Sequence, residues 1–252
     1  MGAWFPGERV VLRGKDVFTE LNNKTWMEFF IYGLTGKMSA DTAKLLEGVW
    51  LISTSYPDPR LWNNRVAALA GTCRSTGVLA AAAGISVSEA SIYGLKPIKG
   101  AIDFLYRAAE QKERGESLES IIKKELKTYR AVHGYGRPLV SADERVNPLM
   151  KYADSLGMAD GPYIKLAFEI EQWFKDSRYK YQINIAAVSA ALFADCGITP
   201  KEKYYMATLS FIAGIYPCYI SGLEQPEGSF LPLNTNRINY RGKNKLRVWG
   251  NI

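Results

Sequence analysis

Histidine and cysteine are the scarcest chemically reactive residues in this sequence. His133 is the only histidine among 252 residues, which excludes a histidine-rich metal site and any mechanism that needs two imidazoles. The three cysteines, Cys73, Cys196 and Cys218, are odd in number and show no Cys-x-x-Cys spacing. We therefore interpret them as free thiols of a reducing compartment, and we expect neither a disulfide framework nor a metal site.

Long apolar runs are also missing. No uninterrupted apolar run reaches the roughly 18 residues needed to cross a bilayer. The first residues, MGAWFPGERVV, lack the apolar stretch of a signal peptide. We therefore expect a cytoplasmic chain without a membrane partner. With 47% hydrophobic and 23% charged residues, the chain has the composition of a globular protein, large enough for a main body with a small lobe.

Basic residues exceed acidic ones, and the formal net charge is +7. This favours anionic partners. Apart from the segment 237–247, however, the cations are spread along the chain. A polycarboxylate or a coenzyme A thioester explains the excess as well as a nucleic acid does, and nucleic-acid binding rests on net charge alone. We expect a small anionic substrate and no tightly bound cofactor.

Helical patterns fill most of the sequence. Thr25 and Glu28 form a capping-box pattern before WMEFFIYGL, and Gly36 suits the end of that helix. The small-residue stretch 65–83, broken near 75–77, is typical of helices packed in a core or a subunit interface. Only the segment 8–16 reads as an extended arm or hairpin. The patterns predict an all-α fold with a short N-terminal hairpin, and the apolar small-residue helices favour a homodimer.

The segment 132–151, VHGYGRPLVSADERVNPLMK, has the most distinctive combination of residues. Gly134 and Gly136 surround one residue, which lets the backbone adopt positive φ and approach a ligand closely. Arg137 follows at once, and Arg145 lies near the next helical pattern, where it can offer a planar fork to a carboxylate or phosphate. The alternative is a connecting loop in which the glycines only make the turn and Arg145 pairs with a local acid such as Asp143.

This segment resembles the active-site loop of the citrate synthase superfamily, Gly-x-Gly-His-Pro followed by Asp-Pro-Arg. Other segments resemble the family in order along nearly the whole chain. Lys99, or Ile98 in a shifted register, falls where the family has its first catalytic histidine. Trp62 is the closest counterpart of a substrate-binding histidine, and Asn184 matches the family's Asn-Val-Asp segment. Arg237 belongs to a tail that resembles Arg-Pro-Arg-x-x-Tyr-x-Gly.

The resemblance implies a citrate synthase-like helical fold with a large domain and a small lobe. In the short form similar to citryl-CoA lyase and the C-terminal module of ATP-citrate lyase, it places the large domain at 1–110, the small lobe at 111–180 and the return to the large domain at 181–252. The family's chemistry uses an aspartate as base and histidines that stabilise an enolate and polarise the acceptor. Here Ala186 stands at the aspartate position and Arg137 at a histidine position. Because alanine takes no proton and arginine is a very poor base, ordinary citrate synthase activity is not expected.

Two functions follow from these departures. The first is a divergent enzyme that makes or breaks a C–C bond in an anionic substrate, a polycarboxylate or an acyl-CoA. The second is a non-catalytic homologue that binds an anion or partners an active subunit. The predicted catalytic residues are His133, Arg137 and Lys99, with Tyr135 as a further candidate proton carrier. The predicted substrate-binding residues are Trp62, Gly134, Tyr135, Gly136, Arg145, Asn184 and Arg237.

Overall fold

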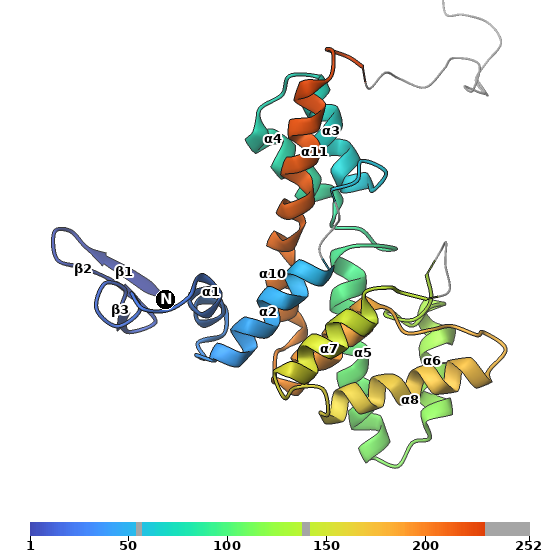
Figure 1. The fold of residues 1–252 in the computed structure, drawn as a ribbon. Helices are drawn as coiled ribbons and strands as arrows, with labels where there is room; N and C mark the ends of the chain where they lie inside the picture. Colours follow the sequence, from blue (N-terminus) through green and yellow to red (C-terminus); the bar gives the residue numbers. More distant parts are fainter. Residues whose placement is uncertain (54–56, 138–141, 230–252) are drawn as a thin grey trace, which may run out of the picture.

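The structure is a computed structural model that describes residues 1–53, 57–137 and 142–229. It is a mostly helical fold in three parts: an N-terminal arm, a main body and an upper lobe (Figure 1). The helices are α1 (Trp26–Thr35), α2 (Ala40–Ser53), α3 (Trp62–Thr72), α4 (Gly77–Val87), α5 (Leu95–Glu113), α6 (Leu118–Tyr129), α7 (Val146–Ser155), α8 (Pro162–Asp176), α9 (Ile185–Asp195), α10 (Pro200–Thr208), the 3₁₀ helix η1 (Leu209–Phe211) and α11 (Ile212–Glu224).

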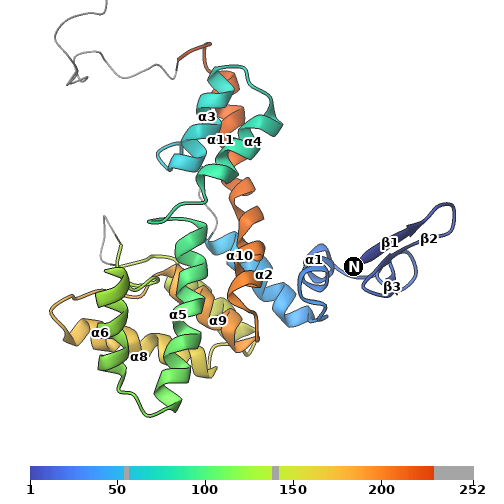
Figure 2. The same ribbon diagram turned by 180° about the vertical axis from the view of Figure 1, so that it is seen from behind.

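The N-terminal arm is a small antiparallel sheet of β1 (Gly2–Phe5), β2 (Arg9–Leu12) and β3 (Lys15–Asp16) in the order β1-β2-β3. It projects to one side of the body beside α1 (Figures 1 and 2). Arg13 anchors it, because its guanidinium donates to the carbonyls of Gly33 and Leu34 near the end of α1, at 3.0 and 3.1 Å. The sequence predicted a hairpin over 8–16, and the structure adds the strand β1 to it.

The main body surrounds α9. Nearly every side chain of this helix is buried, from Ile185 to Ala194, as expected of a helix that is apolar on all sides. Helices α5, α7 and α8 pack against it, and the long α5 also contacts α10. The core contains residues from each of the three predicted segments, 1–110, 111–180 and 181–252. The predicted domain boundaries stay a prediction, and the segment 111–180 shares its core with the rest of the body.

The upper lobe consists of α3, α4 and α11 (Figures 1 and 2). Glycine allows α3 and α11 to touch along their backbones: a Cβ at Gly71 would lie 2.4 Å from the Tyr219 carbonyl oxygen, and one at Gly222 would lie 2.4 Å from the Ala68 carbonyl oxygen. Thr76 caps the start of α4, which confirms the predicted break near 75–77. The small-residue segments therefore form closely packed helices, as their composition predicted.

The helices α10, η1 and α11 form a rod of 25 residues, Pro200–Glu224, that joins the body to the lobe. By length and composition, this rod is long and apolar enough to cross a membrane, with a mean hydropathy of 1.4 over its apolar window. Two-fifths of that window is buried inside the fold (39%), and core helices of water-soluble proteins pass the same test. The expectation that the chain has no membrane partner therefore stays a prediction.

Candidate functional site

The loop that follows α6 is fixed to the start of α9 by backbone hydrogen bonds. Asn184 N–H donates to the Gly134 carbonyl at 2.9 Å, and Gly136 N–H donates to the Gln182 carbonyl at 2.8 Å. Between them, Tyr135 and Ile183 form an antiparallel bridge. The two segments lie about 48 residues apart in the sequence. The Gly-Tyr-Gly turn is therefore held by the body of the protein as a rigid platform beside the N-terminus of α9.

Both glycines of this turn are required by their surroundings. Gly134 has φ of 97°, and a Cβ there would lie 2.4 Å from the Cβ of Ala187 on α9. Gly136 has φ of 81°, and a Cβ there would lie 3.3 Å from the ring of Tyr181. These positive φ values and close approaches explain the two glycines without a ligand. Their role in bringing the backbone close to a substrate stays a prediction.

Asn184 is the residue that connects the turn to the helix. Its side-chain amide donates to the Gly136 carbonyl at 2.9 Å, and its side-chain oxygen accepts from Ala186 N–H at 2.9 Å as the N-cap of α9. Ala186 therefore lies in the first turn of α9, half-buried, at the position where the resemblance places a catalytic base. A methyl group at this place cannot take a proton, so the departure that the sequence indicated is also present in the geometry.

A buried carboxylate lies between the loop and α9. The side chain of Asp143 is 0% exposed and accepts Ile185 N–H at 2.9 Å. Arg145 binds the same carboxylate in a bidentate manner, with Nε–Oδ1 and Nη2–Oδ2 distances of 2.8 Å. Burial alone would raise the pKa of Asp143, but the hydrogen bonds from Arg145 and Ile185 outweigh it and lower that pKa. The fork of Arg145 is therefore filled from within the loop, as the alternative interpretation of the sequence expected.

Arg137 lies on the outer side of this pair. Its Nη1 is 3.8 Å from Asp143 Oδ1, so both arginines do converge on one anion, and that anion belongs to the protein. Nη1 also donates to the Ala142 carbonyl at 3.0 Å and to Glu144 Oε2 at 2.6 Å. The side chain of Glu144 is 61% exposed, in contrast to that of Asp143. The two cations predicted as ligand contacts thus have unequal partners.

The imidazole of His133 packs directly on α5. A Cβ at Gly100 would lie 2.3 Å from His133 Cδ2, so the glycine makes room for the ring. His133 is half-buried, and this burial lowers its pKa, an effect that the nearby Glu125 partly offsets. The imidazole is therefore mostly neutral at pH 7 and can accept a proton. Gly100 follows Lys99, so the structure brings the histidine next to the α5 segment that contains the predicted lysine.

Lys99 and Trp62 lie on α5 and α3. Lys99 is exposed on the second turn of α5. Trp62 begins α3 and packs edge-on against Tyr93, with ring centroids 4.4 Å apart, just before α5 begins. Its Nε1 is buried and has no hydrogen-bond acceptor among the described residues. A buried donor without a partner is uncommon in native proteins.

Tyr135 occupies a different place from the one expected. Its ring is 8% exposed and packs on Phe174, and its hydroxyl donates to the Ala167 carbonyl of α8 at 2.9 Å. Burial raises the pKa of this hydroxyl far above its ordinary value. The side chain therefore belongs to the core, and its position does not support a proton carrier. Only the Tyr135 backbone remains beside the turn. Arg237 lies outside the described residues.

The sequence indicated Asp143 as an alternative partner of Arg145, but not its contact with Ile185 N–H at the start of α9. The signal for the pair was present, because an acid and an arginine two residues apart can pair within a loop. The interactions of Glu144 with Arg137 and of Gly100 with His133 were also missed. Both depend on contacts across the fold or around a turn that spacing alone does not specify.

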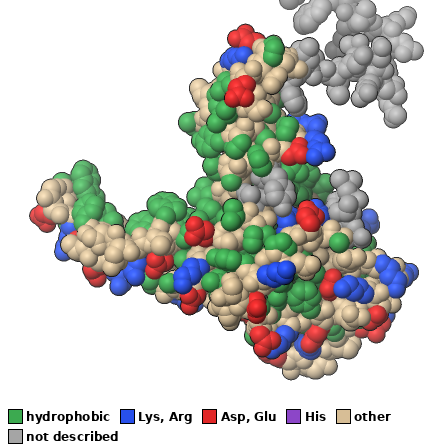
Figure 3. Space-filling model, viewed as in Figure 1, with side chains coloured by type: hydrophobic (Ala, Val, Ile, Leu, Met, Phe, Trp, Pro, Cys, Tyr) green, Lys and Arg blue, Asp and Glu red, His purple; other side chains and the backbone are tan. Residues whose placement is uncertain are grey.

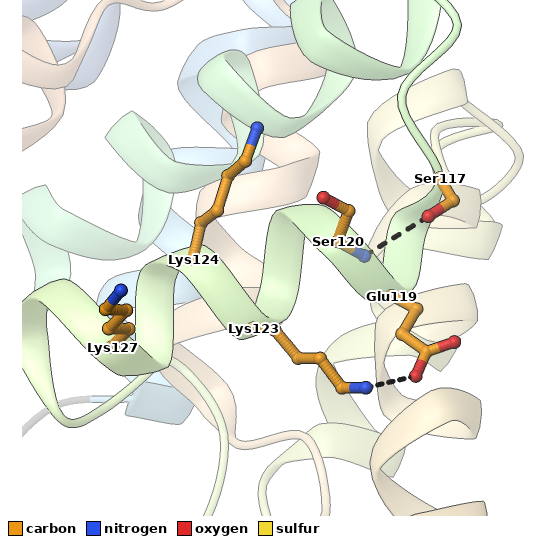
Figure 4. Close-up of a pocket in the computed structure, with 6 residues that line it drawn as sticks. All are labelled: Ser117, Glu119, Ser120, Lys123, Lys124 and Lys127. Carbon is orange, nitrogen blue, oxygen red and sulfur yellow. Dashed lines mark hydrogen bonds and ion pairs between the residues drawn. The ribbon is translucent and has the colours of Figure 1, made fainter.

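Two surface hollows of about 400 and 490 Å³ lie on α6 and at the end of α8, away from this loop. Figure 4 shows the first of them, along the exposed face of α6. Lys123 pairs with Glu119 at 2.5 Å, and Lys124 pairs with Glu116. Because these lysines have acidic partners from the same segment, we interpret the face as solvated, as the charged sequence predicted.

No protein-family model and no curated protein sequence matches this chain. Solved structures with the same fold do. Citryl-CoA lyase from Hydrogenobacter thermophilus superposes with a TM-score of 0.83 and 18% identity over 98% of this chain and 95% of that one. ATP citrate lyase from Methanothrix soehngenii, in complex with citrate and coenzyme A, gives 0.80 and 17%, over 97% of this chain and 41% of that one.

Citrate synthase from Thermotoga maritima gives a TM-score of 0.69 and 15% identity, over 89% of this chain and 59% of that one. The chain thus spans about two-fifths of the ATP citrate lyase and three-fifths of the citrate synthase. The predicted all-α architecture and the resemblance in fold are confirmed. At these identities the likeness concerns the fold, and the chain has the citrate synthase-like helical fold in the short form that citryl-CoA lyase displays.

Proposed function

We propose that this chain is a divergent citrate synthase-like enzyme that acts on an anionic substrate, a polycarboxylate or an acyl-CoA, by making or breaking a C–C bond without the usual His/His/Asp set. The observation that carries the proposal is the Gly-Tyr-Gly turn, held rigidly at the N-terminus of α9 with Arg137 at its end. Support for the substrate class comes from the ATP citrate lyase of the same fold, which is described with citrate and coenzyme A.

The residues present suit one part of such a reaction, the stabilisation of negative charge on an oxygen. Negative charge develops on a carbonyl oxygen when the neighbouring C–C bond forms or breaks, and a cation placed in advance stabilises it. Arg137 is our candidate for this role, with Lys99 as a second cation. His133, largely neutral at pH 7, is the candidate for holding or moving a proton. Trp62 supplies a buried N–H that has no partner among the described residues and can donate to a substrate oxygen.

The missing base limits the rate of any reaction that begins with removal of a proton from acetyl-CoA. Loss of one general base commonly lowers a rate by about 10²–10⁴-fold. We therefore expect no citrate synthase turnover with oxaloacetate and acetyl-CoA at the rate of an ordinary enzyme. Release of the free thiol of coenzyme A, measured with a thiol reagent, is the assay. Ordinary rates would show that the residue aligned with the base, Ala186, was misassigned.

The reverse reaction, cleavage of citryl-CoA, distinguishes an enzyme from a non-catalytic homologue. We expect the wild-type chain to consume citryl-CoA faster than Arg137→Gln and His133→Gln, with acetyl-CoA followed by mass spectrometry. A matched control is Lys127→Gln, an exposed cation on α6 away from the loop. If all four chains show the same background rate while citrate or coenzyme A still binds, the chain is a binding homologue that lacks this activity.

We also propose a homodimer. The lobe exposes apolar side chains on α4 and α11, among them Val78 (75% exposed), Leu79 (60%) and Ile220 (52%), and Figure 3 shows hydrophobic groups gathered there. Contiguous apolar surface of this kind is typical of subunit interfaces. Light scattering at micromolar concentration should give about twice the chain mass. Leu79→Glu should halve that mass, whereas Leu51→Glu, on α2 outside the lobe, should not. A wild-type monomer contradicts the proposal.

A further inference from the structure

The two arginines of the loop differ in how easily a ligand can reach them. Arg145 and Asp143 form a closed unit: the arginine side chain is 13% exposed and the aspartate side chain 0%. The carboxylate also accepts a backbone N–H from Ile185 at the start of α9. A ligand that took Arg145 would leave a buried carboxylate without its closest cation, with Arg137 3.8 Å away as the remaining one, which is unfavourable.

Arg137 has an exchangeable partner. The side chain of Arg137 is 25% exposed, and its Nη1 donates at 2.6 Å to Glu144 Oε2, whose side chain is 61% exposed. A hydrogen bond from its own backbone N–H, followed by that from Arg137, lowers the pKa of Glu144, which keeps the carboxylate charged. Exposed ion pairs contribute little to stability because water solvates both partners when they separate. Glu144 can therefore leave Arg137 at small cost when another carboxylate arrives.

We propose that Arg137 is the cation that receives the ligand carboxylate, that Glu144 holds this position in the unliganded chain and competes for it, and that Arg145 with Asp143 only positions the loop. This inference rests on the proposed function. It makes Glu144 a residue that sets affinity and selectivity, since only an anion that binds Arg137 better than Glu144 does will displace it. Of the two arginines that the sequence predicted as site residues, only Arg137 then binds the ligand.

Isothermal titration calorimetry with citrate as the probe tests the competition. Glu144→Gln keeps the shape and removes the charge, so citrate should bind about two- to fivefold more tightly, which is the range expected for loss of an exposed ion pair. Glu119→Gln is the matched control, because it removes an equally exposed paired carboxylate (58%) on α6 and changes the net charge by the same amount. Equal affinities for the two variants would overturn the role of Glu144.

Two further variants test the different roles proposed for Arg137 and Arg145. Arg137→Gln should weaken citrate binding at least tenfold and lower the melting temperature less than Arg145→Gln does, because Arg137 lies 3.8 Å from Asp143 whereas Arg145 binds that carboxylate at 2.8 Å. Arg145→Gln should lower the melting temperature by several degrees, because Asp143 stays buried without its closest cation. If Arg145→Gln keeps the wild-type melting temperature and loses affinity as Arg137→Gln does, Arg145 binds the ligand and the inference is wrong.

A measurement without ligand separates this inference from the proposed function. Phenylglyoxal modifies accessible arginines, and peptide mass spectrometry locates the product. Arg137 should react faster in Glu144→Gln than in the wild type, and Arg145 should stay protected in both. If the arginines react with phenylglyoxal in this order while neither the wild type nor Glu144→Gln binds citrate, the proposed substrate class is overturned together with the ligand role of Arg137. If citrate binds while Arg145 reacts as fast as Arg137, only the assignment of the two arginines is overturned.

Discussion

Lys203 is an unusual side chain in this fold. It lies on α10, is 2% exposed, and places its Nζ 4.0 Å from the centre of the Phe193 ring on α9. No hydrogen bond or ion pair joins this Nζ to another described residue. Burial lowers the pKa of Lys203 from its ordinary value of 10.5 to about 7. The folded chain therefore disfavours the charged ammonium, and replacing Lys203 by methionine should remove that penalty.

The sign and size of the effect follow from the two pKa values. Between pH 7 and 10.5 the unfolded chain binds the proton that the folded chain releases, so stability rises with pH across this window. At 1.36 kcal/mol per pKa unit, the penalty is roughly 4 kcal/mol at pH 7 and roughly 2 kcal/mol at pH 9. It is full below pH 7 and absent above pH 10.5. The cation–π contact between the charged ammonium and the Phe193 ring offsets about 0.5–2 kcal/mol of this penalty.

Urea unfolding at pH 7 and pH 9 measures this contribution. Lys203→Met should be more stable than the wild type by roughly 2–4 kcal/mol at pH 7, with the difference reduced by about half at pH 9. Lys201→Met is the matched control, since Lys201 lies on the same helix and near an aromatic ring but is exposed. Its profile should follow that of the wild type. A Lys203→Met profile parallel to the wild type, or a less stable variant, refutes the argument.

Two other changes near the turn have definite expected results. Tyr135→Phe removes the hydrogen bond from the hydroxyl to the Ala167 carbonyl, and chemical denaturation should show a loss of about 0.5–1.5 kcal/mol without a change in the pH profile of any activity. Gly134→Ala combines a positive φ with a collision at Ala187, so it should destabilise the chain far more than Gly157→Ala, where φ is 69° and a Cβ would meet no described residue other than its chain neighbours within 4 Å. Equal melting temperatures for the two glycine variants would contradict the close contact with α9.

Local sequence signals predicted the helices well. The capping box of Thr25 and Glu28 is present, with Gly36 in a left-handed conformation at the end of α1. Ser117 caps α6, because its side chain accepts from Ser120 N–H. Such features depend on a few neighbouring residues, so the sequence contains all the information that they need. These signals and the small-residue helices predicted the helical class, whereas the citrate synthase-like arrangement of the helices was predicted from the family resemblance.

The partners of the site residues could not be predicted in the same way. Whether Arg145 faces a ligand or Asp143 depends on where the N-terminus of α9 lies, because Ile185 N–H helps to hold that carboxylate from 42 residues away. The direction of Tyr135 likewise depends on α8, which supplies the acceptor for its hydroxyl. Spacing limits which groups can meet, but packing across the fold decides which of them do.

Positions 137 and 186, which depart from the family's pattern, show why the fold can be kept while the chemistry changes. The turn is held by backbone groups of Gly134 and Gly136 and by the side chain of Asn184, all of which are present. Arg137 comes after the last of these contacts. Ala186 contributes only its backbone N–H to them, which any residue except proline can supply. Substitution at 137 and 186 therefore leaves the hydrogen bonds of the platform intact and changes only the groups that it presents to a substrate.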